Sequence, residues 1–315
     1  MKSSDLPLKE LEYLPIQFME SFARSYVLSF PELKLDPQEL LSFLNRKFPT
    51  LKNKNFHNVA ALATSDGVIA SGYGMLRNTY TQGEISFDVG LVCDVFTRVD
   101  FRKMGLFKRV STLAIKREEM TETKFLIGFP IREEVMPGHF SVGWRYIFDM
   151  PLWWALPRLG SIRNIKKNPT LNSTLFTNVT SAIAIKPTDE YLNWRFSLFD
   201  VDYYLVTIPC SDDFAIVRKS KLRKLPFTCI VFMQTTSKNH ARKIVSEIQS
   251  LSLRLGTLGV IGCWNDSYAQ DLFVPTSGLR KSSRVQKVII REVSGFTCPN
   301  EETKFRLSWM DSDTL

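Results

Sequence analysis

Hydrophobic and polar positions alternate along the chain with two different spacings, one typical of helices and one typical of strands. The predicted elements of the first hundred residues are helices at 8–30 and 36–47 and strands at 58–64, 68–76, 84–89 and 90–97. Asp36 followed by Pro37 is a typical helix start, because a capping side chain precedes a proline at the first helical position. Asp66-Gly67 between two apolar runs predicts a β-hairpin.

A glycine turn and a second set of elements follow. Leu106, Val110, Leu113 and Ala114 recur at helical spacing directly after Gly105, with Lys and Arg between them. The elements predicted next are a strand at 125–129, a short helix at 132–141 and a strand at 145–149. This order, β-β-β-α-β-α-β, predicts a mixed α/β sheet.

The second half repeats part of this order after a connector. Residues 150–180 are rich in proline and polar residues. The later predicted elements are strands at 203–208, 213–220 and 227–234, a helix at 237–255 and strands at 258–264 and 285–293. We therefore expect an N-terminal domain at 1–155, a connector at 156–200 and a C-terminal domain at 201–315. The second half has no glycine turn before its helix.

Composition and charge fit a globular chain of two domains. The chain has 315 residues, of which 44% are hydrophobic and 23% are charged. A net charge of +9 is compatible with nucleic acid, an anionic membrane or a polyanionic small ligand. Lys and Arg are spread along the chain, so we expect no nucleic-acid partner. The basic clusters at 163–167 and 218–224 are interpreted as solvated loops.

The cysteines and the N-terminus bear on metal and location. The five Cys form no C-x-x-C pair and the chain has three His, so no metal site is expected. An odd number of cysteines suits a reducing compartment. The N-terminus does not have the pattern of a signal peptide, and no run of 18 apolar residues occurs. These features predict a cytoplasmic protein without a membrane span.

The glycine turn is the strongest candidate for chemistry. Residues 102–108, RKMGLFK, join a predicted strand to a predicted helix. The first amides of a helix have no internal acceptor and the helix dipole is positive there, so such a turn can bind a pyrophosphate. Gly105 permits close approach, and the flanking cations favour a polyanion. An ordinary glycine turn with a solvated basic helix face is an equally good interpretation of this motif alone.

The same segment resembles motif A of the GNAT acyltransferases. The stretch 95–107, VFTRVDFRKMGLF, is similar to a strand followed by R/Q-x-x-G-x-G/A, with Phe107 in place of the last glycine. The resemblance implies acetyl-CoA as cofactor and two GNAT-like lobes, each a mixed, mainly antiparallel sheet flanked by helices, the second lobe degenerate. The implied cofactor-binding residues are Val95, Phe96, Thr97, Arg102, Lys103, Met104, Gly105, Leu106, Phe107 and Lys108.

Other segments extend the resemblance over nearly the whole chain. Gly128-Phe129-Pro130 and Gly143-Trp144 resemble the fifth strand and the following turn of that fold. The segments 191–195, YLNWR, and 309–314, WMDSDT, resemble two-lobed GNAT proteins of bacterial surface-polysaccharide loci.

Candidates for proton transfer follow from the resemblance. Asp94 lies on the motif A strand, where relatives often carry a basic carboxylate, although a structural carboxylate is nearly as good an interpretation. Relatives usually carry a tyrosine acid where this chain has Phe140, so that role cannot be carried over. The adjacent His139 is the second candidate, and Glu133 and Glu134 are alternatives.

Substrate-binding candidates are Tyr146, Trp194 and Arg195, and packing with an ion pair explains the last two equally well. The preferred function is N-acetyl transfer from acetyl-CoA to a primary amine of a small molecule, such as an amino sugar or surface-polysaccharide precursor. The alternatives are a tRNA-dependent aminoacyl transferase of two-lobed GNAT fold and a non-catalytic CoA-binding protein. The sequence does not determine the oligomeric state.

Overall fold

The computed structural model describes the chain except for residues 1–6, 49–56, 177–180, 223, 294 and 313–315. Asp313 and Thr314 of the DSDT ending therefore lie outside the described residues. The chain forms two compact units. The first comprises residues 1–79, 87–146 and 289–298, and the second comprises 80–86, 147–288 and 299–315.

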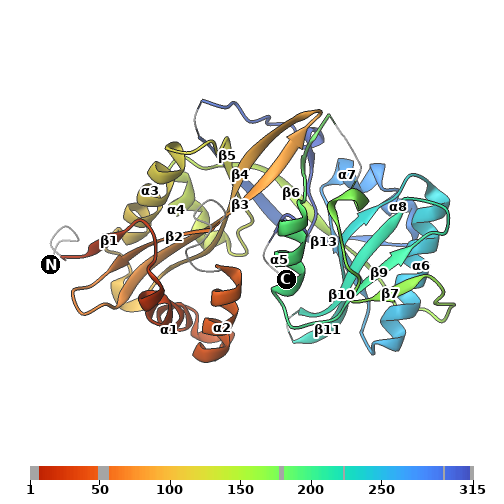
Figure 1. Cartoon of the computed structure of the whole chain (residues 1–315), viewed down its shortest axis with the longest axis horizontal. Helices are drawn as coiled ribbons and strands as arrows, with labels where there is room; N and C mark the ends of the chain where they lie inside the picture. The colour runs from red at the N-terminus through yellow and green to blue at the C-terminus, as the bar shows by residue number, and fades with distance from the viewer. Residues whose placement is uncertain (1–6, 49–56, 177–180, 223, 294, 313–315) are drawn as a thin grey trace. The chain divides into compact units, whose positions relative to one another are not determined.

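The first unit is a mixed sheet with helices (Figure 1). Its elements are β1 (Lys9–Leu11), α1 (Met19–Ser29), α2 (Pro37–Lys47), β2 (His57–Ala63), β3 (Ile69–Gln82), β4 (Ile85–Thr97), α3 (Leu106–Glu119), β5 (Phe125–Gly128), α4 (Met136–Phe140) and the end of β13 (Arg280–Glu292). The strand order is β1-β2-β3-β4-β5-β13. β4 and β5 run parallel, while β1–β2, β2–β3 and β5–β13 are antiparallel.

The second unit has the same kind of sheet. Its elements are most of β6 (Arg145–Ala155), β7 (Ile165–Lys167), β8 (Ile183–Ile185), α5 (Asp189–Ser197), β9 (Tyr203–Thr207), β10 (Phe214–Leu222), β11 (Leu225–Gln234), α6 (Lys238–Arg254), β12 (Val260–Cys263), α7 (Asp266–Asp271), α8 (Val274–Ser277), the start of β13 and β14 (Phe305–Arg306). The order β6-β12-β11-β10-β9-β7 places the parallel pair β11–β12 where the first unit has β4–β5.

Each sheet is completed by a strand from the other half of the sequence. Residues 289–292 of β13 pair with β5, and residues 152–155 of β6 pair with β12. The predicted strand at 145–149 is therefore longer than expected, and Trp153 and Trp154 lie in it rather than in a connector. The mixed α/β fold expected from the sequence is confirmed.

Two predicted elements near the N-terminus differ from the structure. The helix expected at 8–30 is a short strand, a 3-10 helix at Ile16–Phe18 and α1, because Pro15 interrupts the segment. The two strands expected at 84–97 are the single strand β4. Gly90 provides close packing rather than a turn there, since an added Cβ would lie 2.7 Å from Leu126 and 2.9 Å from Met75.

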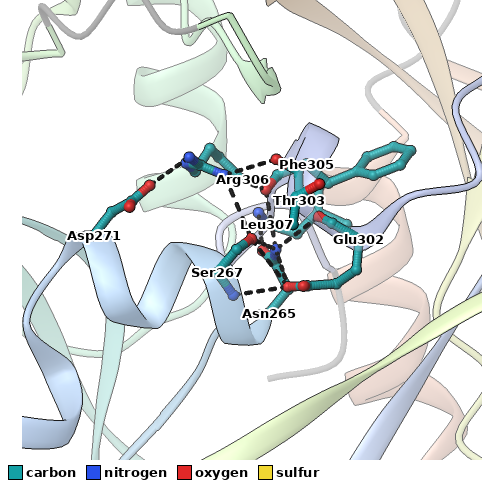
Figure 2. Close-up of polar contacts among 8 residues, drawn as sticks. All are labelled: Asn265, Ser267, Asp271, Glu302, Thr303, Phe305, Arg306 and Leu307. Carbon is teal, nitrogen blue, oxygen red and sulfur yellow. Dashed lines mark hydrogen bonds and ion pairs between the residues drawn. The ribbon is translucent and has the colours of Figure 1, made fainter.

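The C-terminal segment is held in the second unit by buried polar contacts. Figure 2 shows Asn265, just after β12, at the centre of this network. Its side-chain nitrogen donates to the Glu302 carboxylate at 2.6 Å and to the Phe305 carbonyl at 3.0 Å, and its oxygen accepts from the Leu307 amide at 2.9 Å. Asn265 is fully buried, so these bonds satisfy a side chain that would otherwise destabilise the fold.

The basic cluster at 218–224 was expected to be a solvated loop, and this expectation is wrong for residues 218–222, which belong to β10. Arg218 lies within β10 and is only 2% exposed. Among the described residues, no helix is both long and apolar enough to cross a membrane. The same part of the chain contains no group of three His, Cys, Asp or Glu side chains placed to share a metal ion.

Candidate active site in the first unit

The glycine turn between β4 and α3 has the backbone geometry that its sequence predicts. Gly105 is the residue before the first turn of α3, and its φ of 71° lies in the left-handed region. It has no side chain to cap the helix, so the amides of Leu106, Phe107 and Lys108 have no acceptor among the described residues. A Cβ at Gly105 would meet nothing within 4 Å, so the space beside the turn is open. The turn can therefore accept an anion.

β4 separates from β5 just before this turn. The last residue pair between the two parallel strands is Val92–Gly128, and β4 continues to Thr97. The Arg98 amide donates to the Ala70 carbonyl of β3, so the backbone groups of Val95 and Thr97 face the opposite edge, beyond the end of the β5 pairing. This edge offers hydrogen-bonding backbone to an extended ligand that ends at the glycine turn.

The cations around the turn have different roles. Arg102 donates to the Ser29 carbonyl at 2.8 Å and to the Thr97 carbonyl at 3.3 Å, so it fixes α1 and β4 to the turn. Arg109 is held by the Glu10 carboxylate at 2.7 Å. Lys103 and Lys108 are exposed and contribute positive charge at the turn. Of the other predicted residues, Phe96 and Leu106 are buried, so only their backbones could contact a cofactor.

Asp94 lies on β4 and forms a buried ion pair. Its carboxylate is 2.6 Å from the Lys47 ammonium, and the two side chains are 9% and 2% exposed. Lys47 is the last residue of α2 and also lies over the rings of Phe43 and Phe48. Asp94 has a φ of 47°, a conformation that Asp and Asn adopt more readily than most residues. No sequence pattern indicated that Lys47 would be its partner.

His139 lies in α4 among aromatic rings. Its ring contacts Phe107 at 5.1 Å and Trp144 at 5.3 Å between centroids, both edge-on. The side chain is buried, and Nδ1 has no hydrogen-bond partner among the described residues. Burial lowers the pKa of His139 to about 4, so the ring is neutral at pH 7. In that state it could accept a proton but is not a strong acid.

The pKa of His139 predicts how stability changes with pH. Because the folded-state pKa of about 4 lies below the ordinary 6.5, the unfolded chain binds more protons between these values. The free energy of unfolding should therefore be fully retained above pH 6.5 and fall by about 3 kcal/mol as the pH drops to 4. His139→Phe keeps an aromatic ring and removes the titration. The difference in free energy of unfolding between the parent and this variant should therefore change by about 3 kcal/mol over the same pH range.

Chemical denaturation of both proteins from pH 4 to pH 8 measures this difference. Asp311, whose pKa burial raises to about 6, titrates in both proteins and cancels. A difference that stays constant across this range would contradict the assignment of a neutral, buried His139.

The predicted substrate-binding residues lie apart from this turn in the sequence. Tyr146 is 45% exposed, and Phe140, where relatives usually carry the tyrosine acid, is 46% exposed. In the second unit, Arg195 is buried and donates to the carbonyls of Ser312 at 3.0 Å and Trp309 at 3.4 Å. The neighbouring Trp194 packs against Tyr191. Their role in substrate binding stays a prediction.

Comparison with known proteins identifies the fold. No protein-family model and no curated protein sequence matches the chain. Among solved structures, a GCN5-related N-acetyltransferase from Anabaena variabilis ATCC 29413 matches with a TM-score of 0.65 and 11% identity, over 91% of this chain and 73% of its own. One from Kribbella flavida matches with a TM-score of 0.63 and 11% identity, over 93% and 72%. A conserved protein from Enterococcus faecalis V583 matches with a TM-score of 0.65 and 10% identity, over 91% and 73%.

Proposed function

We propose that this chain, which has the fold of GCN5-related N-acetyltransferases, binds acetyl-CoA in its first unit and transfers the acetyl group to a primary amine. The observation that carries the proposal is the turn at Gly105. It has three amides without acceptors among the described residues, and it follows the point where β4 leaves β5. Such a turn suits a pyrophosphate, and Lys103 and Lys108 add positive charge.

The residues present fit the cofactor. The open space beside Gly105 would receive the pyrophosphate, and the backbone of Val95 and Thr97 would hold the pantetheine arm. The bound cofactor supplies the activated acetyl thioester. The protein then has to hold the amine near it, receive the proton that the amine loses and exclude competing water.

Two side chains are candidates for receiving that proton. Asp94 carries a negative charge that Lys47 already balances, so proton acceptance there would weaken an ion pair. His139 is neutral at pH 7 and has an orphaned ring nitrogen among the described residues, but it is surrounded by Phe107 and Trp144. We propose Asp94 or His139 for this role, and separate variants can distinguish them.

We further propose that the acceptor is an amino sugar or a related surface-polysaccharide precursor and that the reaction takes place in the cytoplasm. The acceptor is suggested by the resemblance of 191–195 and 309–314 to two-lobed proteins of polysaccharide loci. The location is suggested by five cysteines that are all free thiols.

Turnover with acetyl-CoA tests the proposed activity. The full chain should release free CoA thiol when incubated with acetyl-CoA and a panel of amino sugars, and mass spectrometry should find the N-acetylated product. Binding of acetyl-CoA without thiol release on any amine in the panel would contradict a catalytic role and favour a CoA-binding protein.

A further inference from the structure

The second unit contains a hollow of about 1000 Å³ beside the end of β10. β9 pairs with β10 only as far as Tyr203–Arg218, and β10 continues to Leu222. The hollow lies along this continuation and is lined by Phe196, Phe199, Tyr203, Tyr204, Arg218 and Lys221, among others. Its volume is at the upper end of the range for small-molecule sites, and aromatic side chains are typical of such sites.

Arg218 is the unusual member of this lining. Its side chain is buried, yet no carboxylate pairs with it among the described residues. The guanidinium lies 4.0 Å from the centre of the Phe199 ring. Within the described part of the chain, it donates one long hydrogen bond of 3.5 Å to the Tyr203 hydroxyl, and Nε has no partner. A buried charge without a counter-charge is costly, so this position calls for an anion.

The other buried arginines show the contrast. Arg117 lies 3.5 Å from the Glu118 carboxylate, and Arg195 donates to two backbone carbonyls. Burial lowers the pKa of the Arg218 guanidinium, and it also lowers that of Arg117, where the Glu118 carboxylate offsets part of the effect. Among the described contacts of these three arginines, only those of Arg218 include neither a carboxylate nor a backbone carbonyl.

The other charged side chains of the lining do not neutralise Arg218. Lys219 and Lys221 follow it on β10 and are exposed, and strand alternation places them on the opposite face of β10, where Lys219 donates to the Leu255 carbonyl at 2.9 Å. Two carboxylates also line the hollow. Asp202 is already paired with Lys167 at 2.8 Å, and Asp200 is exposed to solvent. Arg218 is therefore the buried cation of the lining, and its guanidinium can bind two oxygens of a phosphate in parallel.

We propose that this hollow binds a phosphorylated small molecule, with the phosphate on Arg218 and an attached sugar or base ring among the aromatic side chains. A guanidinium presents parallel N–H groups to two phosphate oxygens, and aromatic faces pack against the flat apolar surfaces of rings. The phosphate could belong to a nucleotide or to a sugar phosphate. The site lies within the second unit and does not depend on the acetyl transfer proposed for the first.

Binding measurements on the full chain test this site. The probes are uridine diphosphate, glucose 1-phosphate and uncharged glucose, titrated calorimetrically at constant ionic strength. Arg218→Met removes the charge but keeps an apolar stem, and Arg280→Gln removes an exposed arginine of the same unit as a control. At least one phosphorylated probe should bind the parent and the control equally, and bind Arg218→Met about tenfold to a hundredfold more weakly.

The outcomes separate the two phosphate sources and the competing explanation. Tighter binding of uridine diphosphate identifies a nucleotide, and tighter binding of glucose 1-phosphate identifies a sugar phosphate. If Arg218→Met does not fold, the phosphorylated probes are compared with glucose on the parent saturated with CoA, which occupies the pyrophosphate site proposed at Gly105. The proposal is overturned if neither phosphorylated probe binds the parent more tightly than glucose does, or if Arg218→Met binds them as well as the parent.

Unfolding of the unliganded proteins provides a second readout. If the role of Arg218 is to bind a ligand, the substitution Arg218→Met removes an uncompensated buried charge. In the absence of phosphate, the Tm of the variant should then equal or exceed that of the parent. A clear loss of Tm in the variant, together with no phosphate-dependent rise in the Tm of the parent, would instead assign Arg218 a packing role on Phe199.

Discussion

Gly105→Val should abolish acetyl-CoA binding while the chain remains folded. The side chain would occupy the open space beside the turn, and a β-branched residue is strained at a φ of 71°. The first effect blocks the approach of a pyrophosphate, and the second moves the amides of Leu106 to Lys108 away from it. We expect the affinity measured by calorimetry to fall at least about a hundredfold, the loss of several charge-assisted hydrogen bonds.

A matched glycine controls for the backbone strain that this substitution introduces. Gly256 also has a positive φ, of 61°, and open space around its position, but it ends α6 in the second unit. Gly256→Val should therefore cost similar backbone strain, about 1–2 kcal/mol, and leave acetyl-CoA affinity unchanged. Equal affinities for the parent and a folded Gly105→Val protein would exclude this turn as the cofactor site.

Lys47→Met should be the most destabilising single substitution considered for the first unit. It leaves the Asp94 carboxylate buried without its ammonium, which typically costs about 3–5 kcal/mol. Adding Asp94→Asn should recover much of this loss, because the amide is neutral and asparagine tolerates the positive φ of this position. Urea denaturation of the two single variants and the double variant measures the coupling as a double-mutant cycle.

An exposed pair provides the control for the Lys47–Asp94 pair. Lys281 and Asp266 are also 2.6 Å apart, but their side chains are 50% and 46% exposed. Lys281→Met should therefore cost less than about 1 kcal/mol. If Lys47→Met costs no more than Lys281→Met, the buried ion pair does not stabilise the fold as described.

The same Asp94→Asn variant tests the role of Asp94 in proton transfer. A residue that receives the proton typically contributes a factor of about 10²–10⁴ in rate, so kcat should fall in that range with acetyl-CoA affinity nearly unchanged. A purely structural carboxylate would instead lower the Tm and leave the activity per folded molecule within a few-fold of the parent. His139→Phe, assayed in parallel, distinguishes the second candidate.

The sequence predicted the local structure around the turn because that structure depends on local signals. Gly105 followed by apolar residues at helical spacing is sufficient to predict the start of α3, which the structure confirms. The strand that leads into it was also predicted, although its continuity through Gly90 was not. Gly90 resembles a strand break in the sequence, and only the approach of Leu126 shows that it is a packing position.

The exchange of strands could not be predicted, because an apolar strand pattern does not specify its partner. Residues 152–155 and 289–292 pair with strands that lie far from them in the sequence. The same limit applies to charged residues. Lys47 ends an amphipathic helix and Arg218 begins a basic cluster, so both resemble solvated positions in the sequence. Their burial results from tertiary packing.

The structure of the chain with CoA bound tests the central claim most directly. A crystal grown with CoA should show one molecule per chain, with its pyrophosphate on the amides that follow Gly105 and its pantetheine arm along β4 at Val95 and Thr97. The corresponding position in the second unit, between β11 and α6, should contain none, because Ser237 rather than a glycine caps that helix. CoA bound only beside β11, or a first unit that stays empty at saturating CoA, would contradict the account.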